Sequence, residues 1–272
     1  MDLISPRFKG NEYLKKVASN AVVLERGNIG NSVHLVQQAL LDLGYNLPSG
    51  SDGVFGSDTE KAIKVFQKNI PKAVPKIDGI VNEATISALD KLLPTYEYCV
   101  RLNLFFIHRP QVSLNILMDC TKEVYAQYGI RIDKVSEKDL VLNKVQKSRF
   151  FTISTACDWE YNKGEAFQLL SLVISYPSSE ISTVFIRKAK TYSGCGGHIT
   201  GHPACIVDAN PNKWTPAHEI GHVLLTESFS PVHSGNTKNI MHSTQTYYPL
   251  TPILSNKQLI QIRQHPCCTK IR

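Results

Sequence analysis

The sequence predicts an α+β protein in which a small all-α domain precedes a larger domain that mixes strands and helices. Its 272 residues exceed the ~150 of an average domain, which favours two domains. Apolar residues in the first third recur at helical spacing, whereas β-branched runs in the second half alternate as in strands. The 42% hydrophobic and 19% charged residues exclude a disordered chain.

Charge and composition restrict the location and the partners of the chain. No apolar run approaches the ~18 residues of a membrane span. The start, MDLISPRFKGNEYLKK, shows no signal peptide, so we expect a secreted, periplasmic or cell-envelope protein that uses another export route, with the cytoplasm as the alternative. The net charge of +7 comes without a nucleic-acid motif, so it predicts a solvated basic surface or attraction to a polyanion such as cell wall or anionic membrane.

The first third contains an internal repeat, at residues 52–59 and 78–85. Each copy has Asp-Gly, an apolar pair, and Thr seven residues after the Asp. Asp-Gly forms a tight turn because glycine accepts a positive φ and aspartate bonds its own backbone. Ahead of the first copy, a helical stripe of Val33, Val36, Leu40 and Leu43 ends at Gly44, which is a natural helix stop.

These features resemble the three-helix peptidoglycan-binding domain. Its signature is matched here by Asp52, Gly53, Phe55, Gly56, Thr59, Phe66, Gln67, Asp78, Gly79 and Thr85. The resemblance implies an extension at residues 1–23, a wall-binding domain at 24–94 with a linker from Pro94, and a second domain at 95–272. The same fold serves as the pro-domain of matrix metalloproteinases, but their zinc-blocking Pro-Arg-Cys-Gly segment has no match, which favours wall binding.

The second half carries the motif H-E-x-x-H, as His218-Glu219-Ile220-Gly221-His222. Residues four apart share one face of a helix, so both imidazoles can bind one Zn²⁺ and Glu219 can take a proton from water at the metal. Pro216 suits a first helical turn, and Thr215 is the expected cap. A catalytic zinc needs a third protein ligand and an open position for water.

The residues that follow resemble the metzincin zinc peptidases. In that family the zinc helix turns, delivers a third histidine in H-E-x-x-H-x-x-G-x-x-H, and is followed by a methionine-containing turn. Here Leu225 replaces the turn glycine and Ser228 stands at the third-ligand position. The resemblance therefore implies the next histidine, His233, as third ligand, with Glu227 as the alternative in a different zinc-peptidase plan.

A Met-turn is implied by Asn-Ile-Met-His at residues 239–242. Met241 is expected to pack below the metal without binding it. We expect His242 at the surface or beside the ligands and not as a fourth ligand. Related enzymes stabilise the oxyanion with a tyrosine two residues after the methionine, but Ser243 is found there. Tyr247 or Tyr248 could be the donor instead, with ordinary packing as the other interpretation.

The order of elements also matches this family between about residues 98 and 266. Strands are expected at 181–187 and 205–208 and a closing helix at 250–263. The resemblance implies a mixed twisted sheet with an active-site helix and a C-terminal helix. It also implies one catalytic zinc ion, which activates water to hydrolyse a peptide bond, with Glu219 as general base.

A second cluster has metal-ligand spacing: Cys195, His198, His202 and Cys205. The alternatives are a Cys195–Cys205 disulfide and four unrelated residues. The chain has seven cysteines, an odd number, so at least one of them cannot pair within the chain.

These observations predict a zinc-dependent metallopeptidase held on bacterial peptidoglycan by its N-terminal domain. The expected substrates are proteins or cell-wall peptides, with neither nucleic acid nor a membrane span. One alternative is a hydrolase of peptidoglycan peptide or amide bonds, which would be a wall-degrading toxin or effector with an inhibitor or immunity protein as partner. The other is a non-catalytic wall-binding protein with a structural zinc.

Overall fold

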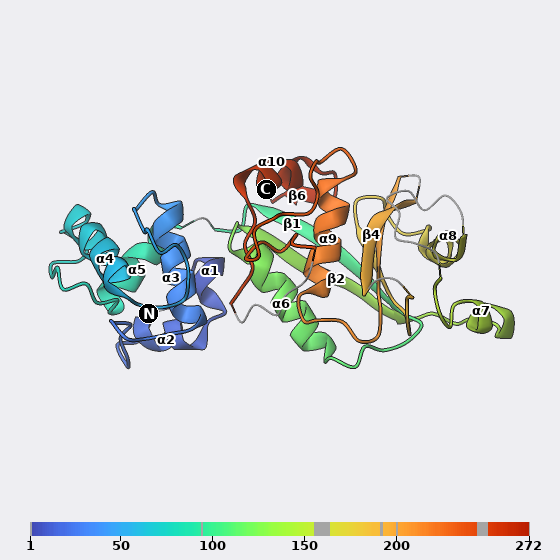
Figure 1. The fold of residues 1–272 in the computed structure, drawn as a ribbon, viewed down its shortest axis with the longest axis horizontal. Helices are drawn as coiled ribbons and strands as arrows, with labels where there is room; N and C mark the ends of the chain where they lie inside the picture. The colour runs from blue at the N-terminus through green and yellow to red at the C-terminus, as the bar shows by residue number, and fades with distance from the viewer. Residues whose placement is uncertain are drawn as a thin grey trace. The chain divides into compact units, whose positions relative to one another are not determined.

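The fold is given by a computed structural model that describes residues 2–93, 95–154, 164–190, 193–199, 201–243 and 250–271. The described residues form two compact units that divide near Tyr96. The first unit is built from helices, and the second contains a mixed six-stranded sheet with helices around it (Figure 1). The predicted α+β class is therefore confirmed.

Unit 1 contains the helices α1 (Pro6–Lys9), α2 (Glu12–Ala18), α3 (Asn31–Asp42), α4 (Ser57–Asn69) and α5 (Glu83–Leu92). The helical stripe predicted before Gly44 lies on α3, whose residues Val33, Val36 and Leu40 are buried. Phe8 of α1 and Leu14 of α2 lie in the same hydrophobic core as Phe66 of α4. The N-terminal extension thus adds two helices to the core of this unit.

The two copies of the internal repeat are held by equivalent buried glutamines. The Gln37 side-chain amide donates hydrogen bonds to Asp52 Oδ1 (2.8 Å) and Thr59 Oγ1 (2.9 Å), and its oxygen accepts one from the Gly53 N–H (2.7 Å). The second copy has the same bonds, from Gln67 to Asp78 (3.0 Å), Thr85 (3.1 Å) and the Gly79 N–H (2.9 Å). Both glycines have positive φ, +76° and +78°, which explains glycine at each turn.

Unit 2 is organised around strands β1 (Tyr98–Phe106), β2 (Ile130–Asp139), β3 (Ile181–Phe185), β4 (Gly194–Ile199), β5 (His202–Val207) and β6 (Cys268–Lys270). The strand order is β2-β1-β3-β5-β4, and β6 pairs with β1. β4 runs antiparallel to β5 and β6 antiparallel to β1, whereas the other pairs are parallel. The strand expected at 205–208 begins earlier, at His202, because residues 202–207 pair with β4 as a hairpin.

The helices of unit 2 are α6 (Leu114–Ala126), α7 (Lys144–Arg149), α8 (Gly164–Leu170), the short 3₁₀ helix η1 (Ser171–Val173), α9 (Thr215–Leu225) and α10 (Asn256–Gln264). α6 and α9 pack on one face of the sheet, and α8 packs against residues such as Val184 and Ile206 that point to the other face. The closing helix starts at Asn256 and not at 250, since Ser255 forms its capping box with Gln258.

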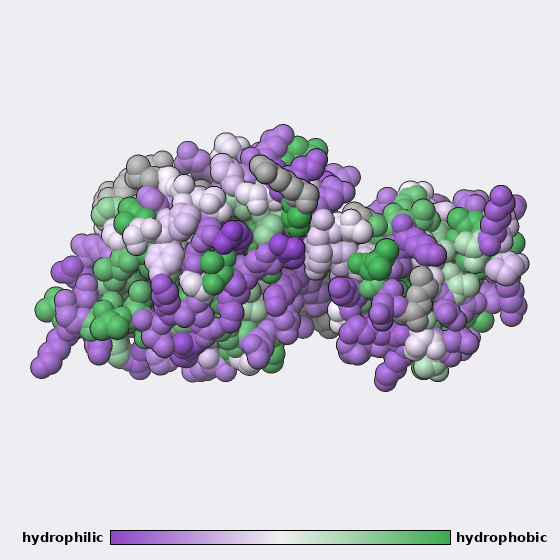
Figure 2. Space-filling model, turned by 180° about the vertical axis from the view of Figure 1, so that it is seen from behind, coloured by the Kyte–Doolittle hydropathy of each residue, from purple (hydrophilic) through white to green (hydrophobic). Residues whose placement is uncertain are grey.

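Among the described residues, no helix is long and apolar enough to cross a membrane. Hydrophilic and hydrophobic residues are mixed over the visible face of both units (Figure 2).

Candidate metal centre

Helix α9 carries the predicted zinc motif in a fully buried setting. All eleven residues of the helix are buried, and Pro216 lies in its first turn as predicted. The predicted cap at Thr215 is wrong, because Thr215 is the first helical residue and Trp214 precedes it without a side-chain cap. The helix ends at Leu225, since Thr226 has a positive φ of 63° and therefore leaves the helical conformation.

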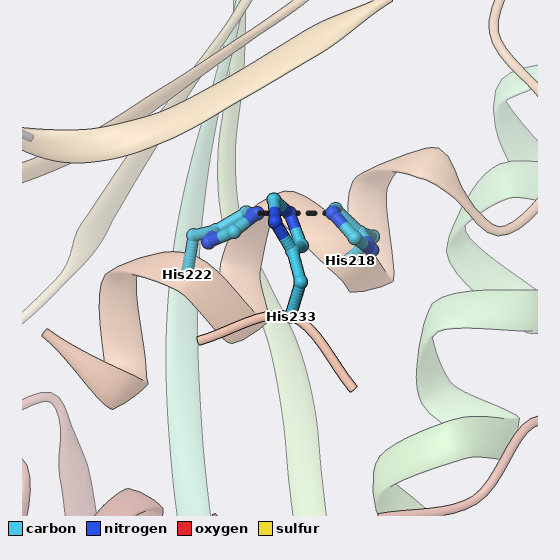
Figure 3. A group of neighbouring side chains, drawn as sticks. All are labelled: His218, His222 and His233. Atoms are coloured by element: carbon cyan, nitrogen blue, oxygen red, sulfur yellow. Dashed lines mark hydrogen bonds between the residues drawn. The ribbon is translucent and has the colours of Figure 1, made fainter. Parts of the chain in front are cut away.

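Three histidines converge at one point, His218 and His222 from α9 and His233 from the loop that follows it (Figure 3). Their candidate ligand atoms all lie within 4.8 Å of one another. The Nε2 atom of His222 is 3.0 Å from that of His218 and 3.2 Å from that of His233. The structure therefore brings together the three histidines named from the sequence. The alternative ligand, Glu227, is exposed and is not in this group.

The orientation of His218 is set by the Met-turn. Its Nδ1 atom lies 2.6 Å from the Ile240 carbonyl oxygen, which can only accept a hydrogen bond. The proton is therefore on Nδ1, and Nε2 presents its lone pair to the other two rings. Burial, followed by the neighbouring imidazoles, lowers the pKa of His222 to about 2, and burial lowers that of His218 to about 4. Both rings are thus neutral, as metal ligands must be.

Glu219 is buried beneath strand β4, and glycines make room for it. A Cβ atom on Gly194 would lie 2.5 Å from Glu219 Oε1, and one on Gly196 would overlap the Glu219 backbone oxygen. Burial raises the pKa of the Glu219 carboxyl to about 8, although the backbone N–H of Gly196 donates a hydrogen bond that opposes the shift. These two glycines were not identified as site residues from the sequence, although the run Gly-Cys-Gly-Gly was a visible signal.

The Met-turn packs directly under the zinc helix. Met241 is fully buried, and a Cβ atom on Gly221 would overlap its sulfur. The Met241 N–H donates to Asn239 Oδ1 (2.9 Å), and the Asn239 amide donates to Gln258 of α10 (2.8 Å). Helix α10 thus fixes the turn that orients His218. A positive charge on His242, the residue after Met241, would lower the pKa values of His218 and His233.

The second cysteine–histidine cluster does not form as expected. Cys205 is a free, fully buried thiol whose pKa burial raises to about 12, whereas Cys195 is disulfide-bonded. The Cys195–Cys205 disulfide and a metal site using both thiolates are therefore wrong. In the β4–β5 hairpin Cys195 lies opposite Ile206 and Cys205 opposite Gly196, so the two side chains point to opposite faces. His198 and His202 lie near the tip of this hairpin.

The predicted oxyanion donors, Tyr247 and Tyr248, lie outside the described residues.

The donor set fits a zinc ion. Zinc–nitrogen bonds of ~2.05 Å in a tetrahedron place two ligand nitrogens ~3.3 Å apart. The 3.0 and 3.2 Å separations of the Nε2 atoms are close to that spacing. Three neutral imidazoles also match the ligand chemistry of catalytic zinc sites.

One family model matches a part of unit 1. Residues 29–89 match the model of a putative peptidoglycan binding domain. Unit 1 carries a domain of this family. The type VI secretion system spike protein VgrG3 of Vibrio cholerae is 38% identical over 101 residues, which cover 34% of this chain and 10% of that protein. The N-acetylmuramoyl-L-alanine amidase CwlL of Bacillus licheniformis is 38% identical over 89 residues, which cover 29% of this chain and 24% of that enzyme. The chain thus spans a quarter or less of these relatives.

Among solved structures, metalloproteinase-II from Bacteroides fragilis is similar over 63% of this chain and 54% of that chain, with 17% identity and a TM-score of 0.42.

Proposed function

We propose that this chain is a zinc-dependent peptidase held at the bacterial cell wall by its N-terminal domain. One observation carries the catalytic part: three imidazole nitrogens converge, and the helix that supplies two of them also holds the buried carboxyl group of Glu219. A structural zinc would require the histidines but not this glutamate. A buried carboxyl group whose pKa is raised to about 8 on this helix favours a catalytic role.

His218, His222 and His233 would hold the ion, and Met241 would support them from below. When bound, zinc lowers the pKa of water and polarises a carbonyl group. Glu219 lies on the same helix as two of the ligands, and it accepts a proton from water and passes it to the leaving amine. The hydrogen bond from the Gly196 N–H holds the carboxylate in place during this transfer.

The match at residues 29–89 supports attachment to peptidoglycan and a location in the cell envelope. A binding domain raises the local concentration of wall-associated substrates without taking part in bond cleavage. Peptide bonds of envelope proteins are the proposed substrates. Similarity to a muramoyl-alanine amidase makes peptidoglycan amide bonds the second candidate, although only 24% of that enzyme is covered.

The deciding experiment uses purified peptidoglycan sacculi and a denatured protein substrate, each with the wild-type chain and with Glu219→Gln. Mass spectrometry of released fragments identifies new peptide or amide ends, and zinc content is measured for both proteins. Cleavage of protein that disappears in the variant, with zinc retained, supports the proposal. New ends in sacculi alone would assign the amidase alternative. No Glu219-dependent cleavage of either substrate would reject a catalytic role.

A further inference from the structure

One short helix in unit 2 contributes no buried residue to the hydrophobic core. Helix α7, Lys144–Arg149, has a complete capping box between Asn143 and Gln146, yet none of its residues is buried. The helix stands clear of the sheet at one end of the unit (Figure 1). Leu142 before it and Phe150 after it are buried in the core beneath α8, so both ends of the segment are anchored. The result is a firmly held projection and not a loose loop.

This projection exposes large apolar side chains. The exposed fractions are 98% for Val141, 68% for Val145 and 54% for Phe151. Val141 and Val145 are four residues apart around the start of the helix. Hydrophobic residues also gather over α7 and α8 at the left edge of the view in Figure 2. The Arg187 guanidinium lies over the Phe151 ring, 3.8 Å from its centroid, so Val141 and Val145 are the most exposed apolar side chains of the segment. Exposed apolar side chains that gather on one surface are a feature of interaction sites.

The same segment is strongly basic. From Leu140 to Ser154 it contains Lys144, Lys147 and Arg149 and no acidic residue. The described partner of Arg149 is a neutral amide, Gln168 Oε1 at 2.8 Å.

Three acidic groups that flank the projection in the described part of the chain are already engaged. Glu165 of α8 accepts a hydrogen bond from the Ser154 backbone, and Glu137 and Asp139 of β2 are bound to Arg109. The cations of α7 are therefore available to an anionic surface.

We propose that the α7 projection, residues 140–151, binds the surface of an anionic phospholipid membrane. Valine and phenylalanine side chains would enter the interface while the lysines and the arginine contact phosphate headgroups, which is the mode of interfacial basic helices. The charge of the segment favours an anionic surface, since residues 140–154 carry three cations and no carboxylate. This role is independent of the proposed peptidase activity.

The test measures partition of the full chain onto vesicles of 30% phosphatidylglycerol in phosphatidylcholine and onto pure phosphatidylcholine. We expect binding to the anionic vesicles alone, weakened by raising NaCl from 0.05 to 0.5 M. Val141→Ser with Val145→Ser should reduce the partition coefficient roughly tenfold or more. Lys144→Gln with Lys147→Gln should do the same, because each cation near such a surface contributes about fivefold.

Matched controls come from the same unit. Ile116→Ser with Ile260→Ser removes two side chains that are 50% and 61% exposed on other helices, and Lys122→Gln with Lys270→Gln removes two other cations. Controls should change binding by less than about twofold, and all variants should keep the wild-type unfolding temperature. Equal losses in control and α7 variants would overturn the proposal in favour of general charge attraction.

A second measurement locates the contact. Tryptophan emission from Val145→Trp should shift to shorter wavelength with anionic vesicles. Vesicle binding without that shift would show that another surface makes the contact. No vesicle binding at low salt would overturn the membrane assignment and leave an acidic protein as the occupant to test.

Discussion

Gly221 of the zinc motif lies against the sulfur of Met241, so closely that any side chain at position 221 would overlap it. The two residues are twenty positions apart, and their contact joins the zinc helix to the turn whose Ile240 carbonyl orients His218. The second variable position of H-E-x-x-H, Gly221, is therefore restricted to glycine by this packing. Only glycine allows the Met-turn to approach.

Gly221→Ala tests this packing. The added methyl group must displace Met241 or the helix, and overpacking of this kind costs about 1–3 kcal/mol. We expect a lower unfolding temperature and weaker zinc binding, measured by calorimetry and by competition with a chelator. Gly235→Ala is the control, because nothing lies within 4 Å of the methyl group it would add. Equal losses of unfolding temperature and zinc affinity in the two variants would contradict the close packing of Gly221 against Met241.

The third ligand is tested by His233→Ala beside Glu227→Ala. Loss of one of three protein ligands should weaken zinc binding by at least about a hundredfold, whereas the exposed Glu227 should be nearly neutral. Zinc dissociation constants from chelator competition decide this. The opposite ranking would make Glu227 the ligand and would refute the role of His233.

Zinc affinity should depend weakly on pH in the neutral range. An ordinary histidine, with a pKa near 6.5, competes with the metal by taking up a proton below that pH. Burial lowers the pKa of His218 to about 4 and that of His222 to about 2. We therefore expect nearly constant affinity from pH 8 to pH 6, when titrations are corrected for the chelator. A drop of about fourfold for each ligand between pH 8 and pH 6, steepening toward tenfold per pH unit below pH 6, would show that the imidazoles titrate normally.

The metal-free protein should lose stability as the pH rises. The Glu219 carboxyl has a pKa of about 8 when folded and an ordinary value of 4.5 when unfolded. The folded state therefore binds more protons between these values, and the free energy of unfolding falls from about pH 4.5 to pH 8. Glu219→Gln removes this loss, so the chelated variant should be more stable than the chelated wild type by a few kcal/mol at pH 8. Near pH 4.5 their unfolding temperatures should converge, and a constant difference across the range would contradict a buried carboxyl.

Short-range patterns in the sequence specified most of the elements. The spacing of His218 and His222 requires only one helix, and each Asp-Gly turn requires only a glycine with positive φ. Such features depend on residues a few positions apart, so periodicity and turn chemistry are sufficient to predict them. The resemblance to metzincins added His233, which lies eleven residues beyond the helix pair.

Long-range packing determined the surroundings of Glu219 and the positions of the cysteines. Gly194 and Gly196 reach Glu219 through the hairpin of β4 and β5, and no local pattern specifies that strand β4 passes over the zinc helix. The predicted Cys195–Cys205 disulfide was wrong for the same reason. Spacing in the sequence does not tell which face of a strand a side chain occupies, and the hairpin register places these two cysteines on opposite faces. The sequence alone determined the candidate ligands and the helix that carries two of them, whereas the tertiary structure decided what surrounds them, because burial and cross-strand register arise only when distant segments pack together.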